Sequence, residues 1–322
     1  MAYFDVFNGD ADGICALHQL RLAEPIDSLL ITGVKRDIEL LKNVHASAGD
    51  HITILDISLD KNRNSLLSLL NLGAKVTYID HHFAGDVPVH PALKAYIDRA
   101  PGTCTSSLVN GMLQGRFRIW AVVAAFGDNM GTSAMHLAAP LQLSSKELAV
   151  LRELGEYLNY NAYGDNVNDL LFHPAELYRC LHRYYSPFDF MEAEPVFETL
   201  KQAFKADMGM ARGLQPTYTY SGGAIYILPD QSWSRRVSGA FGNYLAQTES
   251  AIAHAVLIRK REGGYVASVR APRAHPIGAD ELCRLFETGG GRKSAAGIND
   301  LPENDLPRFL DSFRDAFPVL HA

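Results

Sequence analysis

The first 80 residues alternate strand-like and helix-like segments, and this alternation constrains the fold more than any other feature of the sequence. Strands and helices that alternate at this pitch indicate a parallel sheet covered by helices. Ligands of such sheets bind beyond the carboxyl ends of the strands. Strands are predicted at 3–7, 28–33, 51–57 and 75–80, with helices at 13–23, 36–44 and 61–73.

Aspartate or histidine residues follow several of these strands, so they should meet at one edge of the sheet. A single aspartate there is most simply a turn residue or a helix N-cap. Repetition weakens that interpretation, because clustered carboxylates in apolar surroundings need a cation. Carboxylate oxygen and imidazole nitrogen suit Mn²⁺ or Mg²⁺ better than a thiolate-rich zinc site. The residues concerned are Asp10, Asp12, Asp56, Asp80, His81 and His82, together with Asp128, which follows a helix-like run.

The number of ligands at this edge predicts two divalent ions bridged by one carboxylate, an arrangement used in phosphoryl hydrolysis. Lys35 and Arg36 follow the second strand and are therefore candidates to contact a substrate phosphate. An exposed helix start explains these two residues equally well.

The residue pattern changes after Pro216, where strand-like segments follow a mostly helical stretch. We therefore expect an α/β protein with three parts. These are a metal-binding domain at 1–190, a linker helix at 191–213 and a smaller substrate-binding α/β domain at 214–322.

The segment "GGGRKSAAG" (289–297) is interpreted as a glycine-rich loop that enters a helix. Backbone N–H groups, a helix N-terminus and two cations, Arg292 and Lys293, would suit an anion. The alternative is a closely packed turn without a ligand. Residues 231–299 carry ten Lys or Arg against five Asp or Glu, which favours an anionic ligand. The candidate binding residues are Gly289, Gly290, Gly291, Arg292, Lys293 and Arg270.

The net charge, the length of the apolar runs and the cysteine spacing argue against several classes of protein. The net charge of −6 disfavours a large footprint on DNA, because such proteins usually carry a positive excess. No apolar run reaches membrane-spanning length, and no secretory signal is visible. The four cysteines form no CxxC pair, which favours reduced thiols in a cytosol.

Five motifs of the chain, in order, resemble those of the DHH phosphoesterase superfamily. They are "DADG" after the first strand, the aspartate of "TILDIS", "DHH", the "GD" of "AAFGDNMG", and "GGGRKSAAG". The last is similar to the signature of the family's C-terminal DHH-associated domain. The resemblance implies an N-terminal parallel-sheet DHH domain and a smaller C-terminal α/β domain joined by a helical linker. Two-domain members include NrnA-type nanoRNases and oligoribonucleases, RecJ exonucleases and cyclic-dinucleotide phosphodiesterases.

The resemblance implies a metal-binding role for five residues. Asp10 would bind one ion, Asp12 would bind the other, and Asp56 would bridge them. His81 and Asp128 would complete the second site.

The resemblance also assigns roles beyond the metals. His82 would contact the scissile phosphate, and Asp80 would orient a histidine ring. The chain departs from the family at the first metal site, where Val6 or Asn8 stands in place of a His or Asp ligand. Asn8 could supply an amide oxygen instead. Arg292 replaces the family's histidine after GGG and could hold a phosphate bidentately.

These features predict a phosphodiesterase that hydrolyses very short RNA, dinucleotides such as pGpG included, to nucleoside 5′-monophosphates. Attack would be in line, by a water activated between two metal ions, Mn²⁺ first and Mg²⁺ second. Long DNA and membranes are not expected as partners, and a homodimer is one candidate state because relatives form dimers. Three alternatives stay open: a RecJ-like single-strand exonuclease, a phosphatase for nucleotides such as pAp, and a regulatory protein with little turnover.

Overall fold

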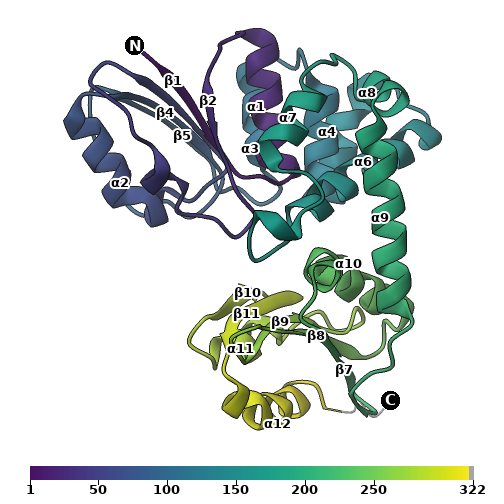
Figure 1. The fold of residues 1–322 in the computed structure, drawn as a ribbon. Coiled ribbons are helices and arrows are strands. Elements are labelled where there is room, and N and C mark those ends of the chain that lie inside the picture. The colour runs from purple at the N-terminus through teal and green to yellow at the C-terminus, as the bar shows by residue number, and fades with distance from the viewer. Residues whose placement is uncertain (319–322) are drawn as a thin grey trace. The chain divides into compact units, whose positions relative to one another are not determined.

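The computed structural model describes residues 1–318 and divides the chain into two compact units. The N-terminal unit comprises Met1–Gln202, and the C-terminal unit begins at Ala203 (Figure 1). Each unit has its own sheet, so each is described by itself.

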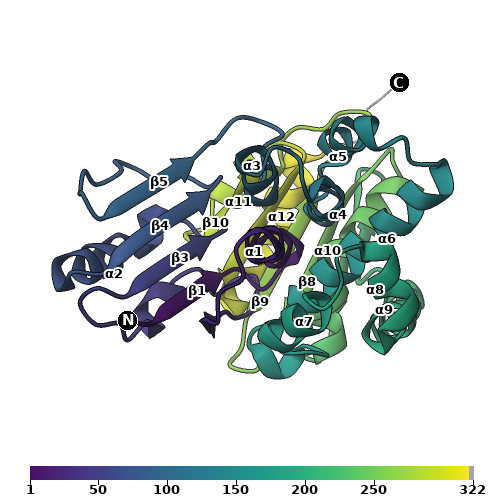
Figure 2. The same ribbon diagram turned by 90° about the horizontal axis from the view of Figure 1, so that it is seen from above.

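The sheet of the N-terminal unit is parallel throughout, as the sequence predicts. The strand order is β2-β1-β3-β4-β5, and Figure 2 shows β1, β3, β4 and β5 side by side. The chain passes from β1 to β2 on one side and then returns to β3 on the other. The topological switch point therefore lies between β1 and β3, where open α/β sheets bind ligands. The strands are β1 (Tyr3–Phe7), β2 (Leu29–Ile31), β3 (His51–Leu55), β4 (Lys75–Asp80) and β5 (Leu93–Ile97).

Helices cover both faces of this sheet (Figure 1). The helix α2 (Leu59–Leu72) packs its apolar side on β1 and β3 side chains such as Val6 and Ile54, and Gly73 ends it in the left-handed conformation. On the opposite face, Arg21 of α1 (Ala11–Ala23) forms a buried ion pair with Asp5 of β1. The ion pair joins the last turn of α1 to β1.

The helix predicted at 36–44 is wrong. Only a short 3-10 helix, η1 (Leu40–Asn43), forms there. The preceding residues are held as a loop instead, because the backbone N–H of Val34 donates to the Asp37 carboxylate.

The remainder of the N-terminal unit is helical, as expected. Within residues 1–318, none of the helices is both long and apolar enough to cross a membrane. The boundary between the two units falls inside α9, at Gln202 and Ala203. The helices are α3 (Thr105–Met112), α4 (Arg118–Gly127), α5 (Gly131–Ala138), α6 (Ser145–Ala162), α7 (Pro174–Leu181), α8 (Pro187–Ala193) and α9 (Pro195–Arg212), with 3-10 turns η2 (Ala139–Leu141) and η3 (Val167–Asp169).

The C-terminal unit contains a mixed sheet of six strands in the order β10-β11-β9-β8-β7-β6. Only β7 and β8 are parallel, and the other neighbours are antiparallel. Phe309 and Phe313 pack on one face of the sheet to form its core. The elements are β6 (Tyr218–Tyr220), β7 (Gly223–Leu228), α10 (Ser232–Thr248), β8 (Ala253–Arg259), β9 (Tyr265–Arg270), α11 (Ala279–Arg284), β10 (Gly289–Arg292), β11 (Ala295–Leu301), η4 (Glu303–Asp305) and α12 (Leu306–Ala316).

The segment 289–297 is not a loop that enters a helix. It forms most of a hairpin in which β10 pairs with β11, so the predicted helix N-terminus is wrong. Ala296 and Ile298 are buried in the core while Ala295 and Gly297 face away from it. This alternation with a period of two residues is the pattern of a strand.

Candidate metal centre

Asp10 begins α1 as its N-cap. Its Oδ1 accepts hydrogen bonds from the backbone N–H groups of Asp12 at 2.9 Å and Gly13 at 3.0 Å. Its Oδ2 pairs with the ammonium group of Lys35. The simple helix-cap interpretation therefore explains one oxygen of Asp10, and a lysine explains the other.

Asp12 is fully buried and points to the N-terminus of α3. Its Oδ2 accepts the backbone N–H of Thr105 and its Oδ1 that of Ser106, both at 2.7 Å. The positive end of the helix dipole stabilises a carboxylate there. Each oxygen of a carboxylate has two lone pairs, so Asp12 keeps the capacity to bind a cation.

Asp56 directly follows β3 and lies at the switch point. Its φ of 61° is in the left-handed region, which is unusual for a residue other than glycine. This conformation holds the buried carboxylate so that Oδ1 accepts the Thr105 hydroxyl at 3.0 Å. Backbone outliers of this kind are maintained by their surroundings and cluster at functional sites.

His81 and His82 follow β4 and are both oriented by oxygen acceptors. Nδ1 of His81 lies 2.8 Å from the Thr103 carbonyl oxygen. A carbonyl can only accept, so Nδ1 donates to it, and Nε2 is the nitrogen that would bind a metal. Nδ1 of His82 lies 2.7 Å from Oδ1 of the buried Asp80.

The structure brings five of the predicted residues together in two overlapping groups. Within residues 1–318, each group has three possible donor atoms that lie within 4.8 Å of one another. His81 links the groups, and its Nε2 lies 3.4 Å from Asp56 Oδ1. One group consists of Asp12, His81 and Asp128, and the other consists of Asp56, His81 and His82. Asp10 belongs to neither group and forms an ion pair with Lys35.

The electrostatics distinguish Asp10 from its neighbours. Burial first, and the nearby Asp128 carboxylate second, raise the pKa of Asp12 to about 6. Burial and the neighbouring carboxylates raise the pKa of Asp56 well above its usual range. Burial acts on Asp10 in the same direction, but the Lys35 ammonium lowers the pKa of Asp10 overall. In the described chain, no lysine or arginine pairs with Asp12 or Asp56.

This donor set fits a divalent ion. Two buried carboxylates that repel each other without a lysine or arginine partner are stabilised when a cation binds between them. Carboxylate oxygens with a neutral imidazole nitrogen are suitable ligands for Mn²⁺. Asp12, His81 and Asp128 would hold such an ion, with the Asp56 carboxylate beside them.

Other predicted residues of this unit lie differently from expectation. The ammonium of Lys35 is held by the acidic residues rather than presented to solvent. Arg36 is half exposed and lies 3.9 Å from Asp165. Asn8 has its side-chain oxygen 3.2 Å from the Asp10 backbone N–H, so its role as a ligand stays a prediction.

The sequence reasoning missed two residues that build this centre. Thr105 binds both Asp12 and Asp56 from the start of α3. Asn159 of α6 accepts a hydrogen bond from Lys35 at 3.2 Å. A threonine at a helix start was a detectable signal, whereas nothing in the sequence around Asn159 links it to Lys35.

In the C-terminal unit, two predicted arginines lie in one row across neighbouring strands. Arg292 of β10 is opposite Ala295 of β11, which is opposite Arg270 of β9. Residues directly opposite in antiparallel strands share a face of the sheet. Gly290 and Gly297 form a second opposed pair, two residues along the same strands, so small residues lie between and beside the two arginines.

These residues differ in their contacts. Arg292 is exposed and makes no ion pair or side-chain hydrogen bond with residues 1–318, and Lys293 is also exposed. Arg270 is held by Asn243 at 2.9 Å and by Ser268 at 2.9 Å. Gly289 and Gly291 are required by the backbone, because a Cβ would collide with the Cys283 carbonyl and with Ala296, respectively. A Cβ at Gly290 would point into open space.

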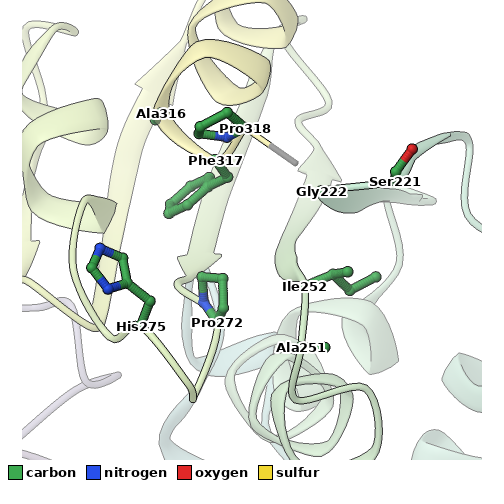
Figure 3. Close-up of a pocket in the computed structure, with 9 residues that line it drawn as sticks. All are labelled: Ser221, Gly222, Ala251, Ile252, Pro272, His275, Ala316, Phe317 and Pro318. Carbon is green, nitrogen blue, oxygen red and sulfur yellow. The ribbon is translucent and has the colours of Figure 1, made fainter. Parts of the chain in front are cut away.

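A small pocket elsewhere in the C-terminal unit has a different character (Figure 3). Phe317, Pro272 and Ile252 give it apolar walls, and His275 lies at its side. None of its nine lining residues is acidic, and none belongs to the arginine row. We therefore assign it no part in metal or phosphate binding.

The fold is that of DHH-domain proteins, as the sequence motifs predict. A manganese-bound RecJ exonuclease is 17% identical, with a TM-score of 0.63 over 98% of this chain and 91% of that chain. The DHH domain of a protein described as a member of a family of ribosomal proteins is 13% identical, with a TM-score of 0.61 over 98% of this chain and 86% of that chain.

A pGpG-specific phosphodiesterase from Vibrio cholerae is 14% identical, with a TM-score of 0.53 over 97% of both chains. No protein-family model and no curated protein matches the sequence. The similarity establishes the α/β fold with its parallel sheet and second mixed sheet, and the chemistry rests on the residues described above.

Proposed function

We propose that the protein is a metal-dependent phosphodiesterase that hydrolyses dinucleotides, pGpG among them, to nucleoside 5′-monophosphates, with Mn²⁺ as the preferred metal. The observation that carries this proposal is the group of Asp12, His81 and Asp128 beside His82 at the switch point of the sheet. The similar RecJ structure is bound to manganese, which supports the choice of metal. The similar Vibrio enzyme is specific for pGpG, which supports the choice of substrate.

The ion would supply Lewis-acid polarisation of the scissile phosphate and an activated water nucleophile. The protein's own part is to hold and orient the ligands. His81 is fixed by the Thr103 carbonyl, and Asp12 is fixed by two backbone N–H groups of α3. Preorganised ligands of this kind need no rearrangement when substrate binds.

His82 is the candidate proton donor. Burial disfavours its charged form, but the hydrogen bond to Asp80 and the charge of Asp80 raise the pKa of His82 above its usual value. A partly exposed imidazolium, favoured by this raised pKa, can donate to a phosphate oxygen or to the leaving oxygen. Asp80 acts through His82 and is a positioning residue.

The arginine row of the C-terminal unit is the proposed binding surface for a nucleotide phosphate. Arg292 has no partner among the described residues, so its planar guanidinium is available for bidentate binding. The small residues Gly290 and Ala295 leave room above the sheet beside it. A net charge of −6 favours a small ligand over a long polyanion.

A substrate-length series tests the proposal. Purified protein is incubated in Mn²⁺ with 5′-labelled RNA of two to ten nucleotides, with pGpG and with pAp. Rapid loss of the dinucleotides to monophosphates is expected, with slower loss of each longer RNA. Equal rates for the ten-nucleotide RNA would indicate a RecJ-like exonuclease, and release of phosphate from pAp alone would indicate a phosphatase.

Two variants make the series specific. The change His82→Ala should abolish hydrolysis, whereas His45→Ala, at an exposed histidine of the same unit, should have no effect. If the wild-type protein binds dinucleotide without hydrolysing it, the proposed enzyme activity is wrong and a regulatory role is favoured.

A further inference from the structure

The side chain of Lys35 lies among the carboxylates at the edge of the parallel sheet, called here the acidic edge, and not on the surface beside them. Its ammonium lies 3.0 Å from Asp128 Oδ1 and 3.2 Å from Asn159 Oδ1, and it pairs with Asp10 Oδ2. An ammonium group has three N–H donors. All three are therefore directed to acceptors of the protein, two of which are carboxylates.

The loop that carries Lys35 is anchored on both sides. The backbone N–H of Lys35 donates to the Ala162 carbonyl at 2.8 Å, and its carbonyl accepts the Asn8 side-chain amide at 3.3 Å. A Cβ at Gly9 would collide with the Gly33 carbonyl oxygen, so the loop packs directly on the segment after β1. The position of the ammonium is therefore part of the fold.

The residues around Asp10 offer an incomplete set of metal ligands. Val6 is apolar and buried, and the Asn8 amide is bonded to the backbone of Asp10 and Lys35. One oxygen of Asp10 caps α1, and the other binds Lys35. Among the described residues, neither group of three metal donors includes Asp10.

Asn8 is involved in both differences from a two-metal site, the missing ligand and the fixed lysine. Asn8 stands where a metal ligand is expected from the family resemblance, and its side chain holds the backbone of the lysine that meets Asp10. The absence of a ligand and the presence of a fixed cation are two consequences of one local arrangement.

We propose that this centre binds a single divalent ion, at Asp12, His81 and Asp128 with Asp56 alongside, and that the Lys35 ammonium takes the place of the second ion. The inference rests on the proposed function, because it concerns the same metal centre. Lys35 then supplies a fixed positive charge to Asp10 and Asp128 without a second metal-binding event. Under this proposal the centre holds one ion, whereas the sequence predicts two bridged ions.

Metal stoichiometry tests this inference without any substrate. The full-length protein is equilibrated with excess Mn²⁺, freed of unbound ions by gel filtration, and analysed for Mn²⁺ per chain together with its electron paramagnetic resonance spectrum. One ion per chain with the six-line spectrum of an isolated Mn²⁺ is expected. Two ions per chain with a spin-coupled spectrum would overturn the inference and leave the proposed function intact, whereas no bound ion would overturn both.

A pair of variants tests the part played by the lysine. Lys35→Ala removes the ammonium from Asp10 and Asp128, so a second Mn²⁺ is expected and the stoichiometry should rise from one to two. Lys42→Ala, at an exposed lysine that pairs with Glu39, should stay at one. An unchanged stoichiometry and affinity in folded Lys35→Ala would show that the lysine does not occupy a metal position. If that variant fails to fold, the wild-type stoichiometry decides alone.

Discussion

The two units of the molecule place their functional charges in opposite ways. The N-terminal unit buries its carboxylates at one sheet edge, where backbone N–H groups, histidines and Lys35 surround them. The C-terminal unit exposes Arg292 on a sheet face made of small residues. A buried charge needs a compensating charge even before substrate arrives, whereas an exposed charge is stabilised by water. The first arrangement therefore suits a bound cation, and the second leaves Arg292 accessible to the ligand that we propose.

The largest effect should follow from a change in the buried group. Asp12→Asn keeps the shape of the side chain but removes a charged ligand, so dinucleotide hydrolysis should fall by about 1,000-fold or more, as loss of several kcal/mol of metal-derived stabilisation implies. Isothermal titration with Mn²⁺ should show weaker binding in the same variant. Wild-type rates in Asp12→Asn would remove the acidic edge from the mechanism.

The exposed arginine should give a smaller effect of a different kind. Arg292→Ala should raise KM by about 10- to 100-fold, the equivalent of one lost charge-assisted hydrogen-bonding group, with little change in kcat. Arg284→Ala is the control, because Arg284 is exposed in the same unit and pairs with Asp280 of its own helix. A fall in kcat with unchanged KM would contradict a binding role for Arg292.

The space beside the arginine row can be filled without disturbing the fold. A Cβ at Gly290 would have no other atom within 4 Å, and the position is on a sheet face without close neighbours, so Gly290→Leu should change the free energy of unfolding by no more than about 0.5 kcal/mol. It should nevertheless raise KM by about tenfold, if a nucleotide lies over this part of the sheet. Urea unfolding and steady-state kinetics of one preparation separate the two effects. A variant with normal kinetics would exclude the surface above Gly290 from substrate binding.

A separate effect, on stability alone, concerns a buried titratable group outside the metal edge. Burial first, and the neighbouring His182 second, lower the pKa of His18 well below its usual value. A histidine with a lowered pKa in the folded state contributes stability above its unfolded pKa of about 6.5. That stability is lost as the pH falls, because the unfolded chain takes up the proton.

The free energy of unfolding should therefore decrease below about pH 6.5 by up to about 1.4 kcal/mol per pH unit for this histidine. Urea titrations between pH 5 and pH 8 measure the slope. His18→Gln should flatten it whatever its effect at neutral pH, whereas His45→Gln, at an exposed histidine, should not. An identical slope in His18→Gln would assign the acid sensitivity to other groups.

The sequence predicts the N-terminal sheet well because its strands are short runs bounded by polar turns. Asp10, Asp56 and His81 were placed at one edge simply because parallel strands end together. The hairpin at 289–297 was not predicted, since a glycine-rich segment with a basic pair also suits an anion-binding loop. Its strand pairing depends on contacts with β9.

The position of Lys35 could not be predicted from local sequence. Its ammonium is fixed by Asn159, which is 124 residues away along the chain, and by Asp128, which is 93 residues away. A lysine after a strand ordinarily suggests a surface charge. Only the packing of α6 beside the sheet edge reveals that the ammonium belongs to the acidic cluster.

The central claim is that Asp12, His81 and Asp128 form a metal centre. Crystals grown with Mn²⁺ and measured on both sides of the manganese absorption edge test it most directly. The account predicts an anomalous peak about 2.0–2.3 Å from a donor atom of each of the three residues. A map without a peak at these residues, from crystals of protein that hydrolyses dinucleotide in the same buffer, would contradict it.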